Sequence, residues 1–154
     1  MLISKILSTE FCGIMQLIQN QMDLLNLKKV LRLKKLSCAR VKFTLTLLDA
    51  REKLKRDDVI MFRIEQLYPF PAKALVNELK PYSKNAEFFW CQEEPKNMGA
   101  WFSVRDYIQW TLDTLKAKYN KISYIGRSPD ATPATGYAKR HNSQQQEIIN
   151  KVFG

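Results

Sequence analysis

From about residue 47 onward, the chain alternates short apolar runs with longer segments in which apolar residues recur every three or four positions. The stretch 47–54 predicts a helix whose charged residues face water. The run 59–64 is apolar and partly β-branched without strict alternation, which is typical of a strand buried on both faces. A rigid turn with two prolines follows. Apolar residues on one face then predict a helix from Ala72 to Leu79, which Pro81 ends.

The second half of this region repeats the pattern. Residues 87–92 predict another buried strand, and a polar loop over residues 93–99 separates it from the next helix. That helix is about 18 residues long and has the clearest amphipathic pattern in the chain. Its apolar residues are Trp101, Val104, Ile108, Leu112 and Leu115. A third short strand over 122–126, a long loop over 127–136 and a last helix over 142–152 complete the pattern. Strands that alternate with helices predict an α/β domain with a largely parallel sheet.

The first 42 residues do not follow this pattern. Residues 27–36 mix leucine and lysine with poor helical order, as an amphipathic membrane-surface helix or a targeting sequence would. The apolar runs are far shorter than the roughly 20 residues that cross a bilayer. Because the basic residues here have few acidic neighbours, we expect residues 1–35 to lack packed core contacts. Val41, Phe43 and Leu45 alternate with polar residues, and we expect them to supply a strand.

Composition is consistent with one globular domain. Of the 154 residues, 45% are hydrophobic, a share that argues against wholesale disorder. The formal net charge of +10 invites a nucleic-acid interpretation. However, residues 1–42 hold eight basic and two acidic residues, a net +6, whereas residues 43–154 hold seventeen and thirteen, a net +4. Since acidic and basic residues are interspersed in the second region, as on a solvated surface, we do not expect it to bind nucleic acid.

Residue types and spacings exclude several site chemistries. Cys12, Cys38 and Cys91 are far apart and form no CxxC pair, which argues against a disulfide framework or a zinc site and suits a reducing compartment. The single histidine, His141, has no identifiable catalytic partner. Cys91 beside Trp90 fits inert packing better than a nucleophile. No two glycines form a GxG, so no glycine-rich phosphate loop is present. We therefore assign no catalytic and no metal-binding residue.

Two loops follow strand ends, where open α/β sheets bind ligands. The first runs from Gln92 to Gly99. It is either a polar recognition loop or a solvated loop whose carboxylates favour the N-terminus of the next helix. The second offers Arg127, Lys139 and Arg140 as anion contacts, or is an ordinary surface loop. The residues alone leave both alternatives open.

Three strings in the chain resemble 2-oxoglutarate dehydrogenase E1, the thiamine-diphosphate subunit. They are RIEQLYPFP from Arg63, WCQEEPKNMGAW from Trp90, and GRS from Gly126, which continues through PATGY to His141 and two glutamines. Their order and spacing agree with the family. Long, unusual strings such as QEEPKNMGAW make this resemblance highly specific, and it covers residues 47–154.

The resemblance implies the C-terminal domain of that subunit, a transketolase-C-like unit of three layers (α/β/α) with a short, largely parallel sheet. The parent enzyme of the tricarboxylic acid cycle oxidatively decarboxylates 2-oxoglutarate and succinylates lipoyl groups. It would form an E1 homodimer and associate with the E2 succinyltransferase, in the bacterial cytoplasm or, alternatively, the mitochondrial matrix. The parent's cofactors, thiamine diphosphate and magnesium, lie mainly on preceding domains, and the family's GDG signature is missing here. We therefore expect a fragment that holds no cofactor and is inactive alone.

Members of the family bind acyl-CoA or adenine-nucleotide effectors at or near this domain. Part of that site would come from a C-S-G-K turn that this reading frame lacks. Gln92 and Arg127 remain as effector-binding candidates, because both follow strand ends. An alternative to the fragment is therefore a stand-alone regulatory or binding module. It would pair with an intact E1 or bind an anionic effector such as acyl-CoA or AMP.

Upstream of Leu47 the resemblance fails. Codons that encode the run from Lys35 can also spell IVLCSGKVYFD in another frame, which looks like the missing family strand and turn. We expect a frame-shifted remnant, and the alternative is a divergent N-terminal extension. The predicted organisation is an atypical basic segment over residues 1–46, out of frame or poorly ordered, and a transketolase-C-like domain over residues 47–154.

Overall fold

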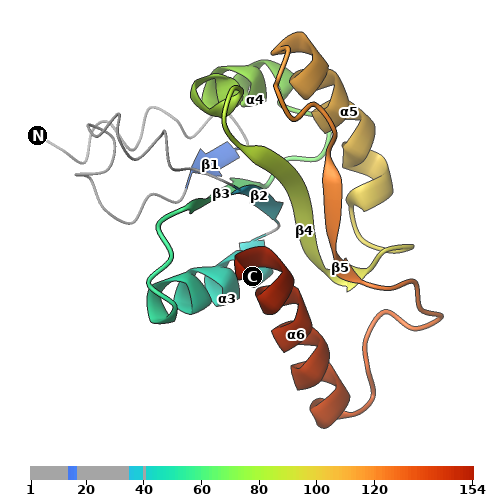
Figure 1. Ribbon diagram of the computed structural model, residues 1–154. Coiled ribbons are helices and arrows are strands. Elements are labelled where there is room, and N and C mark those ends of the chain that lie inside the picture. The colour runs from blue at the N-terminus through green and yellow to red at the C-terminus, as the bar shows by residue number, and fades with distance from the viewer. Residues whose placement is uncertain (1–13, 17–34, 40) are drawn as a thin grey trace, which may run out of the picture.

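A computed structural model describes residues 14–16, 35–39 and 41–154. Within them, a sheet of five strands lies between two pairs of helices (Figure 1). The strands, in their order across the sheet, are β1 (Ile14–Gln16), β3 (Val59–Ile64), β2 (Lys35–Ala39), β4 (Glu87–Pro95) and β5 (Ser123–Arg127). The helices are α3 (Val41–Lys53), α4 (Ala72–Leu79), α5 (Trp101–Thr114) and α6 (Ala138–Phe153), and a short 3-10 helix (Lys80–Tyr82) follows α4. Strands β2 to β5 run parallel, and β1 is antiparallel to β3.

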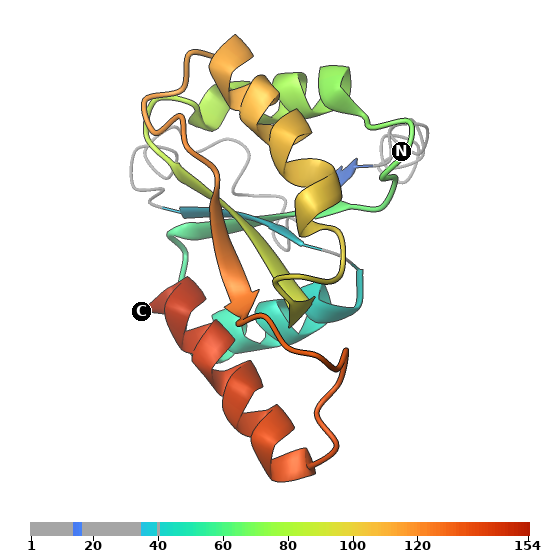
Figure 2. The ribbon, with the colours of Figure 1, turned by 90° about the vertical axis from the view of Figure 1, so that its right-hand side faces the viewer.

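Two helices cover each face of the sheet. Figure 2 shows α4 and α5 on one side and α3 and α6 on the other. Side chains alternate along each strand, so Phe62 and Trp90 pack under α4 and α5, whereas Met61 and Phe89 pack under α3 and α6. The domain therefore has two apolar cores separated by one sheet. The predicted fold class, a three-layer α/β/α unit with a short, largely parallel sheet, is confirmed.

The predicted strand over 59–64 is confirmed with the same bounds. Strand β4 is longer than predicted, because after an irregularity beyond Cys91 its pairing with β5 resumes at Pro95 opposite Arg127. Helix α6 begins at Ala138 rather than at residue 142. Its first turn is polar and largely exposed, so no apolar periodicity marks it in the sequence.

Helix α3 corrects one expectation. The prediction of a strand at Val41, Phe43 and Leu45 is wrong, since all three lie in α3. Phe43, Leu47 and Ala50 recur at spacings of four and three and are buried, whereas Leu45 is 61% exposed. The central position in the sheet is occupied instead by β2, which pairs with β3 on one side and β4 on the other. Helix α3 runs across the boundary expected between residues 46 and 47.

Strand β1 adds to the edge of the sheet, with Ile14 opposite Ile64 and Gln16 opposite Phe62. The expectations for residues 1–13 and 17–34, including a membrane-surface or targeting helix, lie outside the described residues. Within the residues that are described, no helix combines the length and the apolar character needed to cross a membrane.

Candidate functional site at the carboxyl edge of the sheet

The carboxyl ends of β4 and β5 meet at one edge of the sheet, next to α6 (Figure 2). Both residues predicted to bind an effector lie here. Gln92 belongs to β4, and Arg127 is the last residue of β5 and pairs with Pro95. The structure thus brings the two residues to the same edge, but it gives their side chains different surroundings.

Gln92 is buried, with a relative exposure of 1%. Its Oε1 accepts hydrogen bonds from Trp90 Nε1 at 2.8 Å and from the Trp101 backbone N–H at 3.1 Å. Its Nε2 donates to the carbonyls of Met98 at 2.7 Å and Pro95 at 3.1 Å. The amide therefore ties β4, the following loop and the start of α5 together, with its donors and acceptor occupied inside the domain.

Two glycines leave room for this arrangement. Gly99 has a φ of +68°, and a Cβ at this position would lie 2.8 Å from Gln92 Nε2. A Cβ at Gly126 would lie 2.9 Å from the Gln92 carbonyl oxygen. A side chain at either position would therefore displace β4 or its loop.

Arg127 fastens the second loop to the first. Its Nε donates to the Glu93 carbonyl at 2.6 Å, and its Nη2 donates to the Pro133 carbonyl at 2.6 Å. Asn97 adds another link, since its Nδ2 donates to the Asp130 carbonyl at 2.9 Å and its Oδ1 accepts from the Asp130 N–H at 3.0 Å. The loop after β5 is therefore held at two points against the end of β4.

Helix α6 joins this edge through Glu93. Its Oε1 accepts a hydrogen bond from Gln145 Nε2 at 3.3 Å and lies 3.7 Å from His141 Nε2. The second contact is an ion pair only when the imidazole is protonated. Both contacts hold the start of α6 against the end of β4.

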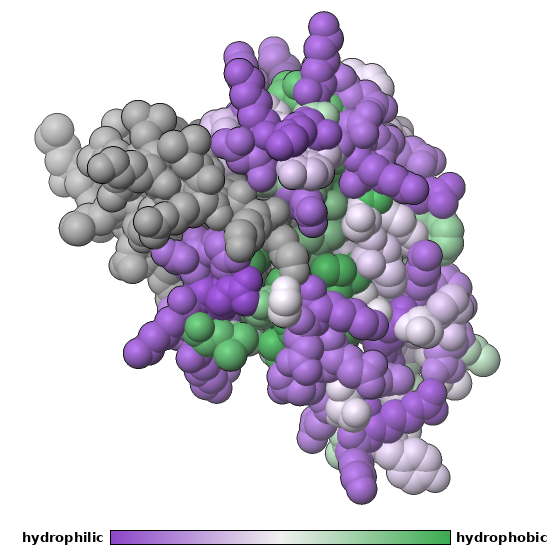
Figure 3. Space-filling view, viewed as in Figure 1, coloured by the Kyte–Doolittle hydropathy of each residue, from purple (hydrophilic) through white to green (hydrophobic). Residues whose placement is uncertain are grey.

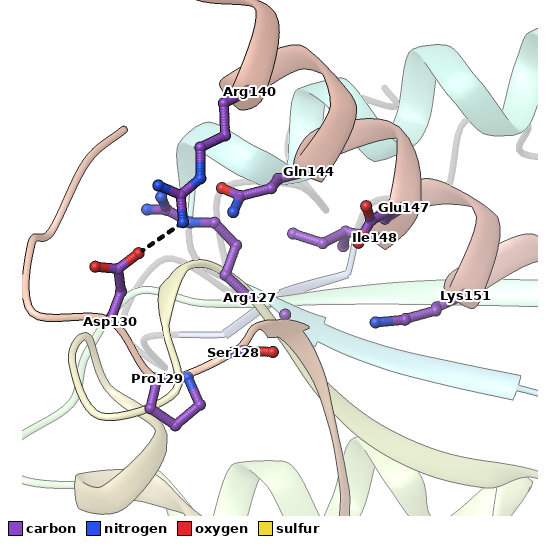
Figure 4. Close-up of a pocket in the computed structure, with 10 residues that line it drawn as sticks. Arg127, Ser128, Pro129, Asp130, Arg140, Gln144, Glu147, Ile148 and Lys151 are labelled. Atoms are coloured by element: carbon purple, nitrogen blue, oxygen red, sulfur yellow. Dashed lines mark hydrogen bonds and ion pairs between the residues drawn. The ribbon is translucent and has the colours of Figure 1, made fainter. Parts of the chain in front are cut away.

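A small pocket opens between the end of β5, the loop that follows it and α6 (Figure 4). Its volume is about 110 Å³, and its charged lining residues are Arg127, Asp130, Arg140, Glu147 and Lys151. Arg140 Nη2 lies 3.4 Å from Asp130 Oδ2. Hydrogen bonds from the backbone and side chain of Thr132, together with the Arg140 guanidinium, hold the pKa of the Asp130 carboxyl below its ordinary value. The pocket thus has three basic groups, partly compensated by two acidic ones.

Cys91 is fully buried, and burial raises the pKa of its thiol. It therefore stays protonated at neutral pH and acts as packing. In the part of the chain that the structure describes, no group of three or more His, Cys, Asp or Glu residues is placed to hold a metal ion.

Tyr124 gives this edge a dependence on pH. Its hydroxyl lies 3.2 Å from the Glu94 carbonyl and 3.1 Å from the Arg127 carbonyl, and burial raises its pKa from 10.0 to about 12. Because the protonated phenol is favoured in the folded state, its stabilising contribution is complete below about pH 10. It is lost as the pH rises through 12.

We expect the free energy of unfolding to fall more steeply between about pH 10 and 12 in the unsubstituted chain than in Tyr124→Phe, by about 1–2 kcal/mol over that interval. Denaturant titrations across this pH range measure the difference. Tyr137→Phe is the control, because Tyr137 is 79% exposed and should keep the original pH dependence. Parallel curves for the unsubstituted chain and Tyr124→Phe would contradict this assignment.

A family model described as 2-oxoglutarate dehydrogenase C-terminal matches residues 8–153. The chain belongs to this family. The 2-oxoglutarate dehydrogenase E1 components of Brucella anthropi and Brucella ovis are 42% identical to it over 135 residues, 88% of this chain. That of Brucella abortus is 48% identical over 108 residues, 70% of this chain. The resemblance found in the sequence is thus confirmed.

The 2-oxoglutarate dehydrogenase match extends upstream of Leu47, beyond the range in which the sequence strings resemble the family. The chain spans 13% of the length of the Brucella anthropi relative and 11% of that of Brucella abortus. A solved structure of a split gene transketolase, an inactive beta4 tetramer, is similar with a TM-score of 0.49 and 13% identity, over 78% of this chain and 38% of that chain.

Sequence reasoning missed most of the contacts at this edge. Asn97 meets Asp130 across 33 positions, and Gln145 meets Glu93 across 52. No local periodicity encodes such contacts. The one signal was in the family strings, since Asn97 and Gln145 both belong to them.

Proposed function

We propose that this chain serves as the C-terminal domain of a 2-oxoglutarate dehydrogenase E1, the thiamine-diphosphate-dependent component that oxidatively decarboxylates 2-oxoglutarate in the tricarboxylic acid cycle. The family match over residues 8–153 carries the proposal. The carboxyl edge supports a structural part in that enzyme, because Gln92, Glu93 and Arg127 fasten loops and α6.

The donor set of the described residues does not fit the parent's cofactors. A divalent metal that binds the diphosphate needs several oxygen ligands, and no suitable cluster occurs among the described residues. Thiamine diphosphate supplies the decarboxylation chemistry itself. We therefore derive no catalytic step for this chain. In this proposal, the residues that bind thiamine diphosphate and magnesium belong to other domains of the parent enzyme.

The test is an assay of the purified chain with 2-oxoglutarate, thiamine diphosphate, magnesium and an artificial electron acceptor. We expect no turnover above the buffer blank and no calorimetric signal for thiamine diphosphate, since a lone histidine cannot replace a positioned acid/base set. The positive control is an intact E1 under the same conditions. Turnover that persists in the purified chain after the host's own 2-oxoglutarate dehydrogenase has been removed would overturn the proposal of a non-catalytic domain.

The parent enzyme also defines proposed partners and a location. These are an E1 homodimer, the E2 succinyltransferase and the bacterial cytoplasm, with the mitochondrial matrix as the alternative compartment. The bacterial relatives support the first compartment. A stand-alone module would instead pair with a separately encoded E1, and co-purification with such an E1 distinguishes this arrangement.

The second candidate function is binding of an anionic effector such as acyl-CoA or AMP at the pocket beside Arg127. Three basic side chains line this pocket, and Gln144 Oε1, which also lies there, is buried and accepts no hydrogen bond within the described residues (Figure 4). Arg127 is the proposed direct contact. Gln92 takes part through the loop that its side chain holds.

Isothermal titration with acetyl-CoA and with AMP tests the effector site. We expect Arg127→Ala to weaken binding of whichever ligand binds by at least tenfold, the loss of about one charge-assisted contact. Arg105→Ala on α5, outside the pocket, should leave the affinity unchanged. Binding that survives Arg127→Ala, or no binding of either ligand, would contradict this candidate.

The origin of the N-terminal region is a separate proposal. The strand spelled by the alternative frame would begin at Lys35, and β2 begins at the same residue in the centre of the sheet. The residues of the given frame form that strand and lie within the family match, which begins at residue 8, so these findings favour a divergent family extension. Sequencing the coding DNA upstream of residue 47 distinguishes it from a frame-shifted strand.

A further inference from the structure

The opposite edge of the sheet, where β4 and β5 begin, carries a cluster of lysines that we call the lysine edge. Its members are Lys80, Lys84, Lys116, Lys118 and Lys121. They come from two segments, one after α4 and one after α5, and Figure 1 places the ends of these helices at the same end of the molecule. The Lys118 N–H donates to the Ser83 carbonyl at 2.9 Å, which joins the two segments directly.

The charges of the lysine edge are not neutralised within the domain. All five side chains are exposed, and none forms an ion pair within the part of the chain that the structure describes. Some basic residues elsewhere do have partners, such as Lys53 with Asp49 at 2.7 Å. Hydrophilic residues dominate this end of the molecule in Figure 3. Like charges gathered without counter-charges favour an anionic partner.

Two members of the lysine edge, Lys118 and Lys121, line a shallow hollow that also contains the carboxylate of Glu87. The hollow has a volume of about 450 Å³ and is lined by residues that include Glu87, Lys118, Tyr119 and Lys121. Lys118 Nζ lies 5.2 Å from the centre of the Tyr119 ring, and Tyr119 is 40% exposed. Two further acids lie near these lysines in the chain, Glu78 and Asp113, and Asp113 accepts a hydrogen bond from Gln109 at 3.0 Å. The hollow thus offers separate positive points rather than a uniform positive groove.

We propose that the lysine edge is a docking surface for an acidic segment of a partner protein. Its ammonium groups are compact point charges suited to individual carboxylates. Glu87 disfavours a continuous phosphate backbone, whereas a peptide can place a neutral residue against it. A single exposed tyrosine offers little stacking area for the bases of a nucleic acid. Contacts of this kind are formed quickly, depend on salt and select partners by charge.

The experiment uses the full chain, a fluorescein-labelled peptide of about 20 residues in which glutamates alternate with serines, and a labelled dT oligonucleotide of the same length, at low and physiological salt. The test variant is Lys84→Glu, Lys118→Glu, Lys121→Glu. The matched control is Lys53→Glu, Lys55→Glu, Lys73→Glu, which makes the same charge change at exposed lysines outside the edge. Circular dichroism confirms that both variants fold.

We expect the edge variant to weaken peptide binding at least tenfold and the control variant less than threefold. Carbodiimide crosslinking of the unsubstituted chain to the peptide should modify Lys84, Lys118 or Lys121. Equal losses of peptide affinity in both variants would show that binding depends on net charge alone and would overturn the proposal. Crosslinks confined to the basic residues 28–35 would overturn it as well. Tighter binding of the oligonucleotide through the same three lysines would assign the surface to nucleic acid instead.

Discussion

Replacement of Gln92 with alanine is expected to lower the free energy of unfolding by about 3–5 kcal/mol, because each buried polar group left without a partner costs about 1–3 kcal/mol. The side chain is 1% exposed. Its removal leaves the N–H donors of Trp90 and Trp101 and the carbonyls of Met98 and Pro95 without this hydrogen-bond partner. The loss should also loosen the loop between β4 and α5, since that loop is tied to β4 by this amide.

Urea denaturation followed by tryptophan fluorescence measures this effect, because Trp90 and Trp101 both contact the substituted side chain. Gln146→Ala is the matched control. That residue is exposed on α6 and, among the described residues, donates only to Asn150, so its loss should stay within about 0.5 kcal/mol. A cost for Gln92→Ala as small as that of the control would show that the amide does not hold the loop.

The second large effect is expected at Ile148, through which α6 packs against the sheet. Ile148→Ala should lower the free energy of unfolding by about 2–4 kcal/mol, the usual cost of removing a buried isoleucine side chain. The residue is 2% exposed and belongs to the core that also contains Met61, Phe89 and Val152. Because α6 also lines the pocket beside Arg127, its detachment should open that pocket.

Ile149→Ala provides the comparison within the same helix. Ile149 is only partly buried at the margin of the same core, so its truncation should cost about 1 kcal/mol or less. Thermal and urea unfolding of both variants give the two values side by side. Equal costs would mean that α6 is not anchored by Ile148, and the structure of the carboxyl edge would then need revision.

Gln92 and Ile148 shape the carboxyl edge through contacts within the domain. The polar residues that sequence reasoning singled out as ligand contacts are largely used by the domain itself. The side-chain amide of Gln92 is fully hydrogen-bonded within the domain, and Arg127 donates hydrogen bonds to two backbone carbonyls. Effector binding at this edge therefore depends on the pocket that these residues build, in addition to any direct contact.

The family and the alternation of helices and strands were predictable from the amino-acid sequence. Buried strands are continuous apolar runs, and the faces of α4 and α5 repeat at helical spacing, so the run over 59–64 and the core positions Ile108 and Leu112 were readable from one-dimensional patterns. The string QEEPKNMGAW identified the family because a long, unusual string is specific regardless of its conformation.

The position of β2 and the roles of the polar residues depend on contacts between segments that are distant in the sequence. Lys35–Ala39 has no apolar run, and its place in the centre of the sheet depends on pairing with β3 and β4, which are distant in sequence. The same holds for Gln92, whose polar side chain predicted an exposed ligand contact. A polar residue is favourable in a core only when specific partners satisfy it, and those partners are brought together by the fold rather than by neighbours in the chain.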